Sequence, residues 1–444
     1  MNSFIIHGDI CYAADKNTLV TRENGYLVCV DGICKGVFGT VPEQYAHLAL
    51  REYGGMLVIP GMVDLHIHAP QYAYRGLGMD KELLDWLNTY AFPEESKYSN
   101  LNYADKAYTI FTDAIKRSAT TRLVVFGTLH REATELLMDK LDKSGMVSYV
   151  GKVNMDRNSP DNLREVSAAE SLADTERFIL NTQHKYKNTA PIITPRFTPS
   201  CSDELMQGLG ELSKEYGVRV QSHLSENPGE VEWVRELCPW AENYGEAYNR
   251  FGLFGKPQKT VMAHCVYSDD NEIARMKENG VFIAHCPASN TNVASGIAPM
   301  RKYLELDMNL GLGSDVAGGH SESMFTAMVD ALQVSRLYWR LVDQSKKPLN
   351  VTEVFYLATK GGGAFFGKVG SFEEGYECDA VILNDSLLPH PQGLSPQERL
   401  ERAIYLGGDV KAMEAKYCRG NVIIRNEEFG ILGGLRPHPF VVKN

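Results

Sequence analysis

The chain repeats one local pattern eight times: a short run of aliphatic and β-branched residues, then a stretch long enough for a helix. Such a run favours a buried strand, and the amphipathic spacing that follows it favours a helix packed against that strand. The runs lie at residues 56–68, 120–128, 146–156, 190–198, 218–226, 259–266, 281–290 and 309–316. Eight strand-helix units in succession are typical of an α/β fold of the (β/α)8, TIM-like barrel type.

The two ends of the chain have a different pattern. Residues 1–56 alternate in the manner of antiparallel strands, with Asp31-Gly32 as a tight hairpin turn. After Gly375 two more strand runs follow, with a helix between them at 397–406. We therefore expect both ends to form one small β-sandwich domain. The predicted division is 1–56 for its N-terminal part, 57–368 for the barrel and 369–444 for its C-terminal part.

Composition excludes several classes of function. The net charge is −11 and no run rich in lysine or arginine occurs, so nucleic acid is not an expected partner. No stretch of 18 apolar residues and no signal-peptide pattern is present, so we expect no membrane span and a cytoplasmic location. The nine cysteines contain no CxxC pair, and an odd number favours reduced thiols over a disulfide framework.

Histidines and an aspartate occupy the ends of several predicted strands. His66 and His68 lie two residues apart on the first run, so their rings point the same way. The fifth, sixth and eighth runs end near His223, His264 and Asp315. Because the carboxyl ends of barrel strands meet at the edge where active sites are built, these side chains are expected to converge. Imidazoles with one carboxylate suit Zn²⁺ or Fe²⁺ better than Mg²⁺, so we predict one divalent metal per chain, with zinc favoured and iron as the alternative.

A metal with an open coordination position activates water for hydrolysis, and the reaction then needs a group that moves protons. Glu226, three residues after His223, is the candidate, with capping of the following helix as its alternative role. Asp315 could accept a proton while it binds the metal. Some barrel hydrolases bridge two ions through a lysine on the fourth strand, but that run has none and Lys152 lies on the third. A single-ion site is therefore predicted.

The fourth strand run also carries residues suited to a flat, polar ring. Arg196 is a permanently charged donor that requires an acceptor, such as a ring carbonyl or a carboxylate, and Phe197 could stack on the ring. Gln71, three residues after His68, offers both a donor and an acceptor to the edge of a heterocycle. These residues favour a planar ring with a carbonyl over an adenine-type edge.

The segment 79–95, just past the first strand run, has the spacing of an amphipathic helix that is expected to stop near Pro93. Its position past the carboxyl end of a barrel strand makes it a candidate wall or lid of the pocket. Trp86 in this segment either lines the pocket or packs in the core.

The motifs together resemble a known family. The runs PGMVDLHIHAPQY, LLDWLNTYAFPEE, TPRFTPSC, QSHLSE, MAHC, HCPASN and GLGSDVAGGH are similar, in this order, to those of the guanine deaminases within the amidohydrolase superfamily. The resemblance covers nearly the whole chain. The HxH and GSD motifs belong to the superfamily at large, whereas the combination of HAxQY, W-L-x-x-Y-x-FP-x-E and PRF is more selective.

The resemblance implies a metal-dependent aminohydrolase, a homodimer, that adds water at C2 of guanine and releases ammonia and xanthine. It implies that the metal ligands are His66, His68, His223 and Asp315. Glu226 would shuttle protons, and His264 would support the attacked carbon. The residues predicted to contact the substrate are Gln71, Trp86, Arg196, Phe197, His223, Glu226, His264 and Asp315, and those predicted to act in catalysis are Glu226, His264 and Asp315. One departure is Pro70, where the family usually has serine, because proline removes a backbone N–H next to Gln71.

Two alternatives remain open from the sequence. One is a deaminase or hydrolase of another aminated heterocycle, such as a pterin, a cytosine-like base or a triazine, which a substrate panel would separate. The other is a scaffold protein with this fold and no catalysis. Such a protein would be expected to lose metal ligands, whereas all of them are present here.

Overall fold

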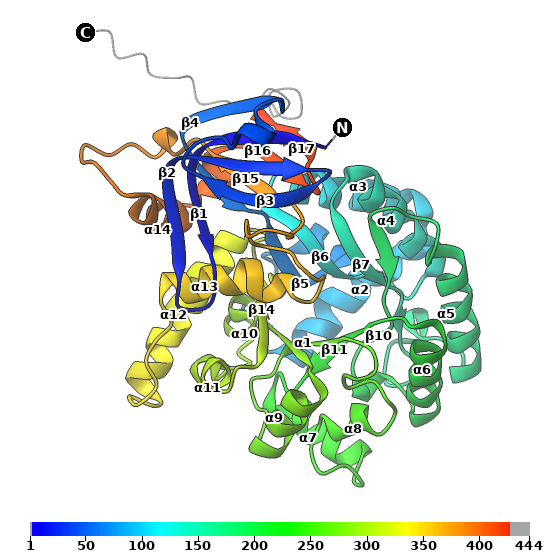
Figure 1. Ribbon diagram of the computed structural model, residues 1–444. Helices are drawn as coiled ribbons and strands as arrows, with labels where there is room; N and C mark the ends of the chain where they lie inside the picture. Colours follow the sequence, from blue (N-terminus) through cyan, green and yellow to red (C-terminus); the bar gives the residue numbers. More distant parts are fainter. Residues whose placement is uncertain (1, 427–444) are drawn as a thin grey trace.

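The computed structural model describes residues 2–426 and has a TIM-barrel-like α/β fold (Figure 1). Two four-stranded parallel sheets contain its central strands. The first has the order β5 (Met62–His68), β6 (Thr120–Phe126), β7 (Val147–Gly151) and β9 (Thr189–Pro191). The second has the order β11 (Val220–Leu224), β12 (Thr260–His264), β13 (Phe282–His285) and β14 (Asn309–Leu312). A short parallel pair joins β8 (Val153–Asn154) to β10 (Thr194–Pro195).

Backbone hydrogen bonds connect the two parallel sheets at both sides. Between β9 and β11, Gln221 N donates to Ile193 O at 2.9 Å. On the other side, Asp315 N donates to His66 O at 2.8 Å and His68 N donates to Val316 O at 3.0 Å. These bonds join the segment after β14 to β5, so the end of the last parallel strand lies against the first.

The strand run expected at 56–68 is two strands that belong to different sheets. β4 (Leu50–Pro60) pairs with strands from the chain ends, and β5 begins after Gly61. Gly61 is needed at this break because a Cβ atom there would lie 2.4 Å from the side chain of Thr121. The expectation of one continuous strand was wrong because an aliphatic run does not show where a chain passes from one sheet to another.

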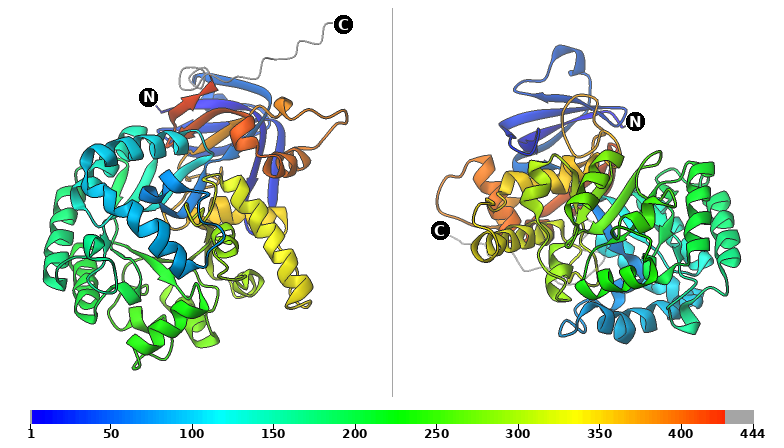
Figure 2. Two further views of the ribbon diagram at one scale, coloured as in Figure 1. Left: turned by 180° about the vertical axis from the view of Figure 1, so that it is seen from behind. Right: turned by 90° about the horizontal axis from the view of Figure 1, so that it is seen from below.

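Helices cover the outer faces of the parallel strands (Figures 1 and 2). The longer ones are α3 (Leu101–Lys116), α4 (Arg131–Ser144), α5 (Ala168–Thr182), α6 (Asp203–Tyr216), α7 (Pro228–Leu237), α9 (Asp270–Asn279) and α12 (Met324–Leu341). The shorter ones are α8 (Glu246–Asn249), α10 (Pro287–Asn292), α11 (Met300–Glu305) and α13 (Val351–Tyr356). Among residues 2–426, no helix is long and apolar enough to cross a membrane.

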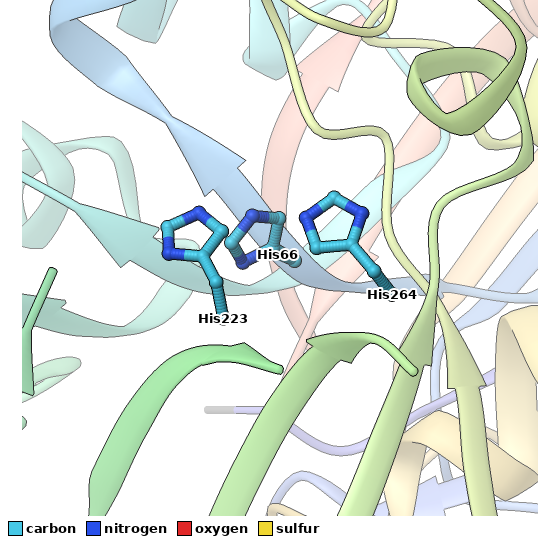
Figure 3. A group of neighbouring side chains, drawn as sticks. All are labelled: His66, His223 and His264. Carbon is cyan, nitrogen blue, oxygen red and sulfur yellow. The ribbon is translucent and has the colours of Figure 1, made fainter. Parts of the chain in front are cut away.

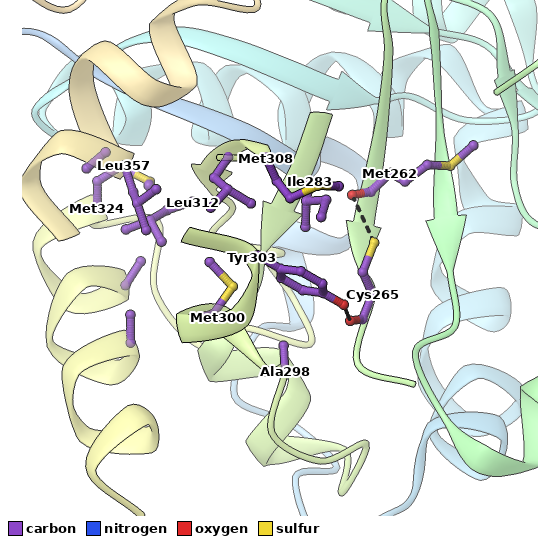
Figure 4. Close-up of a cluster of buried hydrophobic side chains, with 14 of the residues drawn as sticks. Met262, Cys265, Ile283, Ala298, Met300, Tyr303, Met308, Leu312, Met324 and Leu357 are labelled. Carbon is purple, nitrogen blue, oxygen red and sulfur yellow. Dashed lines mark hydrogen bonds between the residues drawn. The ribbon is translucent and has the colours of Figure 1, made fainter. Parts of the chain in front are cut away.

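Alternate residues of each central strand enter different parts of the core. Val63, Val124 and Ala263 belong to one buried cluster among the strands, whereas Ile283 and Leu312 belong to a larger cluster shared with the helices. Figure 4 shows part of this second cluster, between strands β12–β14 and helices α11 and α12. The alternation is what a parallel sheet buried on both faces requires.

Strands from both chain ends share one seven-stranded sheet of order β17-β16-β15-β4-β1-β2-β3. It lies to one side of the parallel strands (Figures 1 and 2). The predicted hairpin is confirmed, because Asp31 and Gly32 have φ values of 51° and 80° between β2 and β3. The predicted helix is confirmed as α14 (Pro396–Tyr405). The other members are β1 (Phe4–Ala13), β2 (Leu19–Val30), β3 (Ile33–Phe38), β15 (Ala380–Leu383), β16 (Met413–Cys418) and β17 (Asn421–Arg425), with α15 (Gly408–Lys411) before β16.

The strands from the chain ends form one seven-stranded sheet, so the expected sandwich of two sheets stays a prediction. The boundaries at 56/57 and 368/369 also remain predictions. Residues 427–444 of the expected C-terminal part lie outside the described residues.

Buried polar contacts attach this sheet to the parallel strands. Arg122 in β6 donates from Nε and Nη2 to the carboxylate of Asp379, at 2.6 and 2.8 Å, just before β15. Both side chains are almost fully buried. Lys416 in β16 donates from Nζ to three carbonyl oxygens around the start of β6, each at 2.9 Å, those of Ile115, Ser118 and Thr120.

We predict that Lys416→Met destabilises the protein by roughly 2–4 kcal/mol, because the three buried carbonyl groups lose their donor. Chemical denaturation of this variant, of a control variant and of the wild type measures the loss of unfolding free energy. The matched control is Lys411→Met, since Lys411 is an exposed lysine in the neighbouring α15. Equal stability of the two variants would contradict the anchoring role of Lys416.

Candidate metal and substrate site

The predicted metal ligands converge at the carboxyl ends of the parallel strands. His66 and His68 end β5, His223 lies near the end of β11, and Asp315 follows β14. The Nε2 atom of His68 lies 3.2 Å from the Nε2 atoms of both His66 and His223. Asp315 Oδ1 lies 3.2 Å from His66 Nε2 and 3.4 Å from His68 Nε2. In Figure 3 the ring of His66 lies between those of His223 and His264, and it is nearly perpendicular to the His223 ring, with the two centroids 4.8 Å apart.

These distances fit a shared cation. Ligand atoms about 2.0–2.1 Å from a tetrahedral zinc ion are separated by roughly 3.3–3.4 Å. His223 Nδ1 donates to Arg196 O at 2.6 Å, which leaves the Nε2 lone pair directed at the cluster. Lone pairs that converge without a proton donor between them repel one another, and a positive ion would relieve that repulsion. The residues present therefore fit one divalent metal ion.

Burial sets the protonation of this cluster. It lowers the pKa of His68 and His223 well below the ordinary value, and the neighbouring imidazoles lower both further. Burial alone would raise the pKa of Asp315, but His66, His264 and His68 hold that pKa far below its usual range. Neutral imidazoles and an ionised carboxylate are the forms that bind metal.

Asp64 connects the ends of β5 and β14. Its Oδ1 accepts from His66 N at 3.1 Å and from Ser314 N at 3.0 Å, and its Oδ2 accepts from Ser314 Oγ at 2.5 Å. The side chain is fully buried, and burial raises its pKa to about 6. No sequence pattern indicated a role for Asp64, although it lies in the same motif as His66 and His68.

His264 and Glu226 stand beside the metal-ligand cluster. His264 Nδ1 lies 2.8 Å from Asn290 Oδ1, and its Nε2 lies 3.4 Å from Glu226 Oε2 and 3.7 Å from Asp315 Oδ2. Burial, with Asp315 nearby, raises the pKa of Glu226 well above its ordinary value. His264 and Asp315 have φ values of 75° and 48°, in the left-handed region that non-glycine residues rarely adopt. Such backbone strain is concentrated at functional sites.

The alternative role of Glu226 as a helix cap is wrong. Asn227 caps α7 by accepting from Gly229 N at 2.9 Å, and Glu230 completes the capping box. Glu230 Oε2 accepts from Glu226 N at 3.0 Å, and its Oε1 accepts from Tyr244 Oη at 2.7 Å. The side chain of Glu226 therefore does not cap the helix: its Oε1 accepts from Ser295 Oγ at 3.3 Å, and its Oε2 faces His264.

The predicted substrate contacts line the same cavity as the metal-ligand cluster. This cavity, including its opening to solvent, has an empty volume of about 460 Å³. Residues from distant parts of the chain surround it: His68, Gln71, Trp86, Arg196, Phe197, His223, Glu226, Glu230, His264 and Asp315. Trp86 serves both roles left open by the sequence, since it lines the cavity and is only 3% exposed.

A buried carboxylate that the sequence analysis missed holds two of these residues. Glu95 accepts from Arg196 Nη1 at 2.5 Å, from Arg196 Nη2 at 3.0 Å and from Gln71 Nε2 at 2.8 Å. Gln71 Oε1 in turn accepts from Ala317 N at 3.2 Å. Arg196 therefore has an acceptor within the protein, which differs from the expectation that it requires one from the substrate. The only sequence signal was the glutamate that ends the W-L-x-x-Y-x-FP-x-E motif.

The helical segment at 79–95 does not stop at Pro93. It runs as α1 (Leu83–Trp86), a π-helical turn at Leu87–Ala91 and α2 (Phe92–Glu95). Pro93 lies in the first turn of α2, where a missing backbone N–H costs little. The helix therefore continues past the proline and brings Glu95 against Gln71 and Arg196, which line the cavity.

Known proteins resemble this chain in sequence and in fold. The model of the amidohydrolase family matches residues 57–410. The chain belongs to the amidohydrolase family. Within that family it is 39% identical over 380 residues to a guanine deaminase of Dictyostelium discoideum, which covers 84% of this chain and 83% of the relative.

Two solved amidohydrolase structures extend the likeness to the whole fold. A guanine deaminase from C. acetobutylicum, with guanine bound in the active site, has a TM-score of 0.92 and 47% identity, over 95% of this chain and 100% of that one. The E. coli guanine deaminase has a TM-score of 0.85 and 30% identity, with the same coverage.

We predict that His66→Ala removes the bound divalent metal, because the three remaining ligands hold zinc far more weakly than four. Elemental analysis of purified, metal-supplemented protein should fall from about one ion per chain to well below one. His320→Ala is the control, since His320 is exposed after the same β14 segment that carries Asp315. Retention of the wild-type metal content by His66→Ala would contradict the ligand role.

Proposed function

We propose that this amidohydrolase converts guanine and water to xanthine and ammonia. One observation carries the proposal: a single cavity is lined by residues of the metal-ligand cluster and by Gln71 and Arg196, which Glu95 holds together. The first group suits hydrolysis, and the second suits the edge of a ring that has both donors and acceptors. The likeness to guanine deaminases over most of the chain supports the same substrate.

The proposed metal ligands are His66, His68, His223 and Asp315, and one zinc ion is favoured over iron. A divalent ion held there supplies a Lewis acid that makes water acidic enough to react near neutral pH. The cluster contains three imidazoles and one carboxylate, an arrangement that zinc accepts readily. Lys152 forms a buried ion pair with Glu165, which is consistent with a site for a single ion.

Glu226 is the proposed proton carrier. Its raised pKa allows it to take the proton from the attacking water and keep it until the amino group leaves. The water oxygen then forms a bond to C2, the bond between C2 and the amino nitrogen breaks, and the nitrogen leaves as ammonia with the added proton. His264 faces Glu226 and Asp315, which supports its proposed role beside the attacked carbon, and Asp315 is the proposed group that orients the water.

Gln71, Arg196, Phe197 and Trp86 are the proposed contacts of the base. Phe197 and Trp86 supply flat apolar surface, while Gln71 and Arg196 supply hydrogen-bonding groups. Pro70 does not deprive Gln71 of support, because the side chain of Gln71 is held by Glu95 and by Ala317 N.

The other functions weighed from the sequence have less support. A scaffold without catalysis would not need the buried, proton-carrying Glu226 or a complete ligand set. Another aminated ring remains the alternative substrate, and the substrate panel that includes a pterin, cytosine and a triazine tests it.

A closed eight-stranded barrel, a homodimer and a cytoplasmic location are further predictions. The nine free, buried cysteines suit a reducing compartment.

We predict that the wild-type protein loaded with zinc releases ammonia and xanthine from guanine, and that Glu226→Gln keeps its metal but loses about two to four orders of magnitude in kcat. Coupled ammonia detection and elemental analysis measure the two quantities. Glu232→Gln is the control, because Glu232 is an exposed glutamate on the same α7.

Failure of the wild type on guanine, with turnover of another ring in the panel, would assign a different substrate. Near-normal turnover by Glu226→Gln would instead remove Glu226 from the proton transfer.

A further inference from the structure

Glu95 is a buried charge that the proposed reaction does not use. It is 1% exposed and lies at the end of α2, and its carboxylate accepts three hydrogen bonds from Arg196 and Gln71. Two of the five N–H groups of Arg196 are used in this way. Phe92 covers a face of the guanidinium, with the Arg196 Cζ atom 4.9 Å from the ring centroid.

The ion pair changes what the cavity presents to a ligand. A lone arginine would favour an anion, since it is a permanent positive charge in a buried site. Paired with Glu95, Arg196 offers N–H donors but little net charge. The proposed metal ion adds positive charge near Glu226, Glu230 and Asp315, but this contribution is common to the wild type and to every variant compared below. Arg196 therefore offers no unpaired positive charge to an anionic purine, but it still offers N–H donors to the carbonyl group of a neutral one.

We propose that Glu95 determines the charge selectivity of the cavity: it orients Arg196 and Gln71 and cancels the arginine charge, so that neutral purines bind and anionic purines are rejected. Glu95 is thus a positioning residue that acts through its two neighbours. This inference rests on the proposed function for the class of ligand. It also bears on product release, because xanthine loses a proton more readily than guanine and its anion is disfavoured in the cavity.

Two purine probes of different charge test the proposal at a fixed pH of about 7.5, at which hypoxanthine is neutral and urate is a monoanion. Calorimetric titration of the zinc-loaded protein gives a dissociation constant for each. Wild type should bind hypoxanthine more tightly than urate. In Glu95→Gln, the ratio of the urate constant to the hypoxanthine constant should fall about ten- to a hundred-fold, the range expected for one charge-assisted contact.

Matched variants separate charge from packing. Glu94→Gln is the control, because Glu94 is the adjacent buried glutamate and bonds to Lys97 and Tyr103. It should keep the wild-type ratio. Glu95→Asp retains the negative charge and should also keep the ratio, even if guanine turnover falls. Arg196→Gln leaves Glu95 as an unpaired negative charge and should raise the ratio.

A folded Glu95→Gln with the wild-type ratio would overturn the proposal. If that variant does not fold, a ratio in Arg196→Gln that fails to rise would overturn it, and so would a wild type that prefers urate. Guanine turnover is measured separately by ammonia release. A wild type that binds the probes with the expected preference but leaves guanine unchanged would refute the proposed reaction and retain the charge selectivity.

Discussion

The site depends on the hydrogen bonds that hold the end of β5 against the segment after β14. Two backbone bonds and the buried carboxylate of Asp64 make this connection. His66 and Asp315, 249 positions apart (315 − 66), are thereby brought to 3.2 Å. Metal-ligating side chains do not come together spontaneously, because their lone pairs repel one another and the polar groups lose hydration on burial. The strand pairing supplies the free energy that keeps them together until an ion binds.

Much of this arrangement could be predicted because it follows from strand periodicity. A strand that ends in His66-x-His68 must direct both rings to one side, and parallel strands must end at one edge. Residues at other strand ends, such as His223 and Asp315, were therefore predictable without knowledge of any helix. The continuous strand expected at 56–68 was not correct, since only the close approach of Gly61 to Thr121 shows where the chain leaves one sheet for the other.

The residues that the sequence did not indicate are those whose direction depends on tertiary packing. Glu95 contacts Arg196 from a helix that contains a π-helical turn between Trp86 and Phe92. One extra residue in a turn rotates everything after it by about 100°, and hydrophobic periodicity does not register such a change. Asn290 and Asp64 are similar cases: each is an ordinary polar residue until its partner, His264 or Ser314, is placed beside it.

The position of β4 in the seven-stranded sheet affects how the protein is made. Its neighbours are β1, which is synthesised before it, and β15, which pairs Ala380 with Pro60 and Leu383 with Leu57. While the ribosome translates the intervening barrel segment, one edge of β4 has no partner and exposes unpaired N–H and C=O groups. Such an edge is a template for pairing with other chains. The nascent polypeptide therefore covers this edge of β4 only when β15 emerges from the ribosome. Chains truncated before that point keep an unpaired strand edge that favours aggregation.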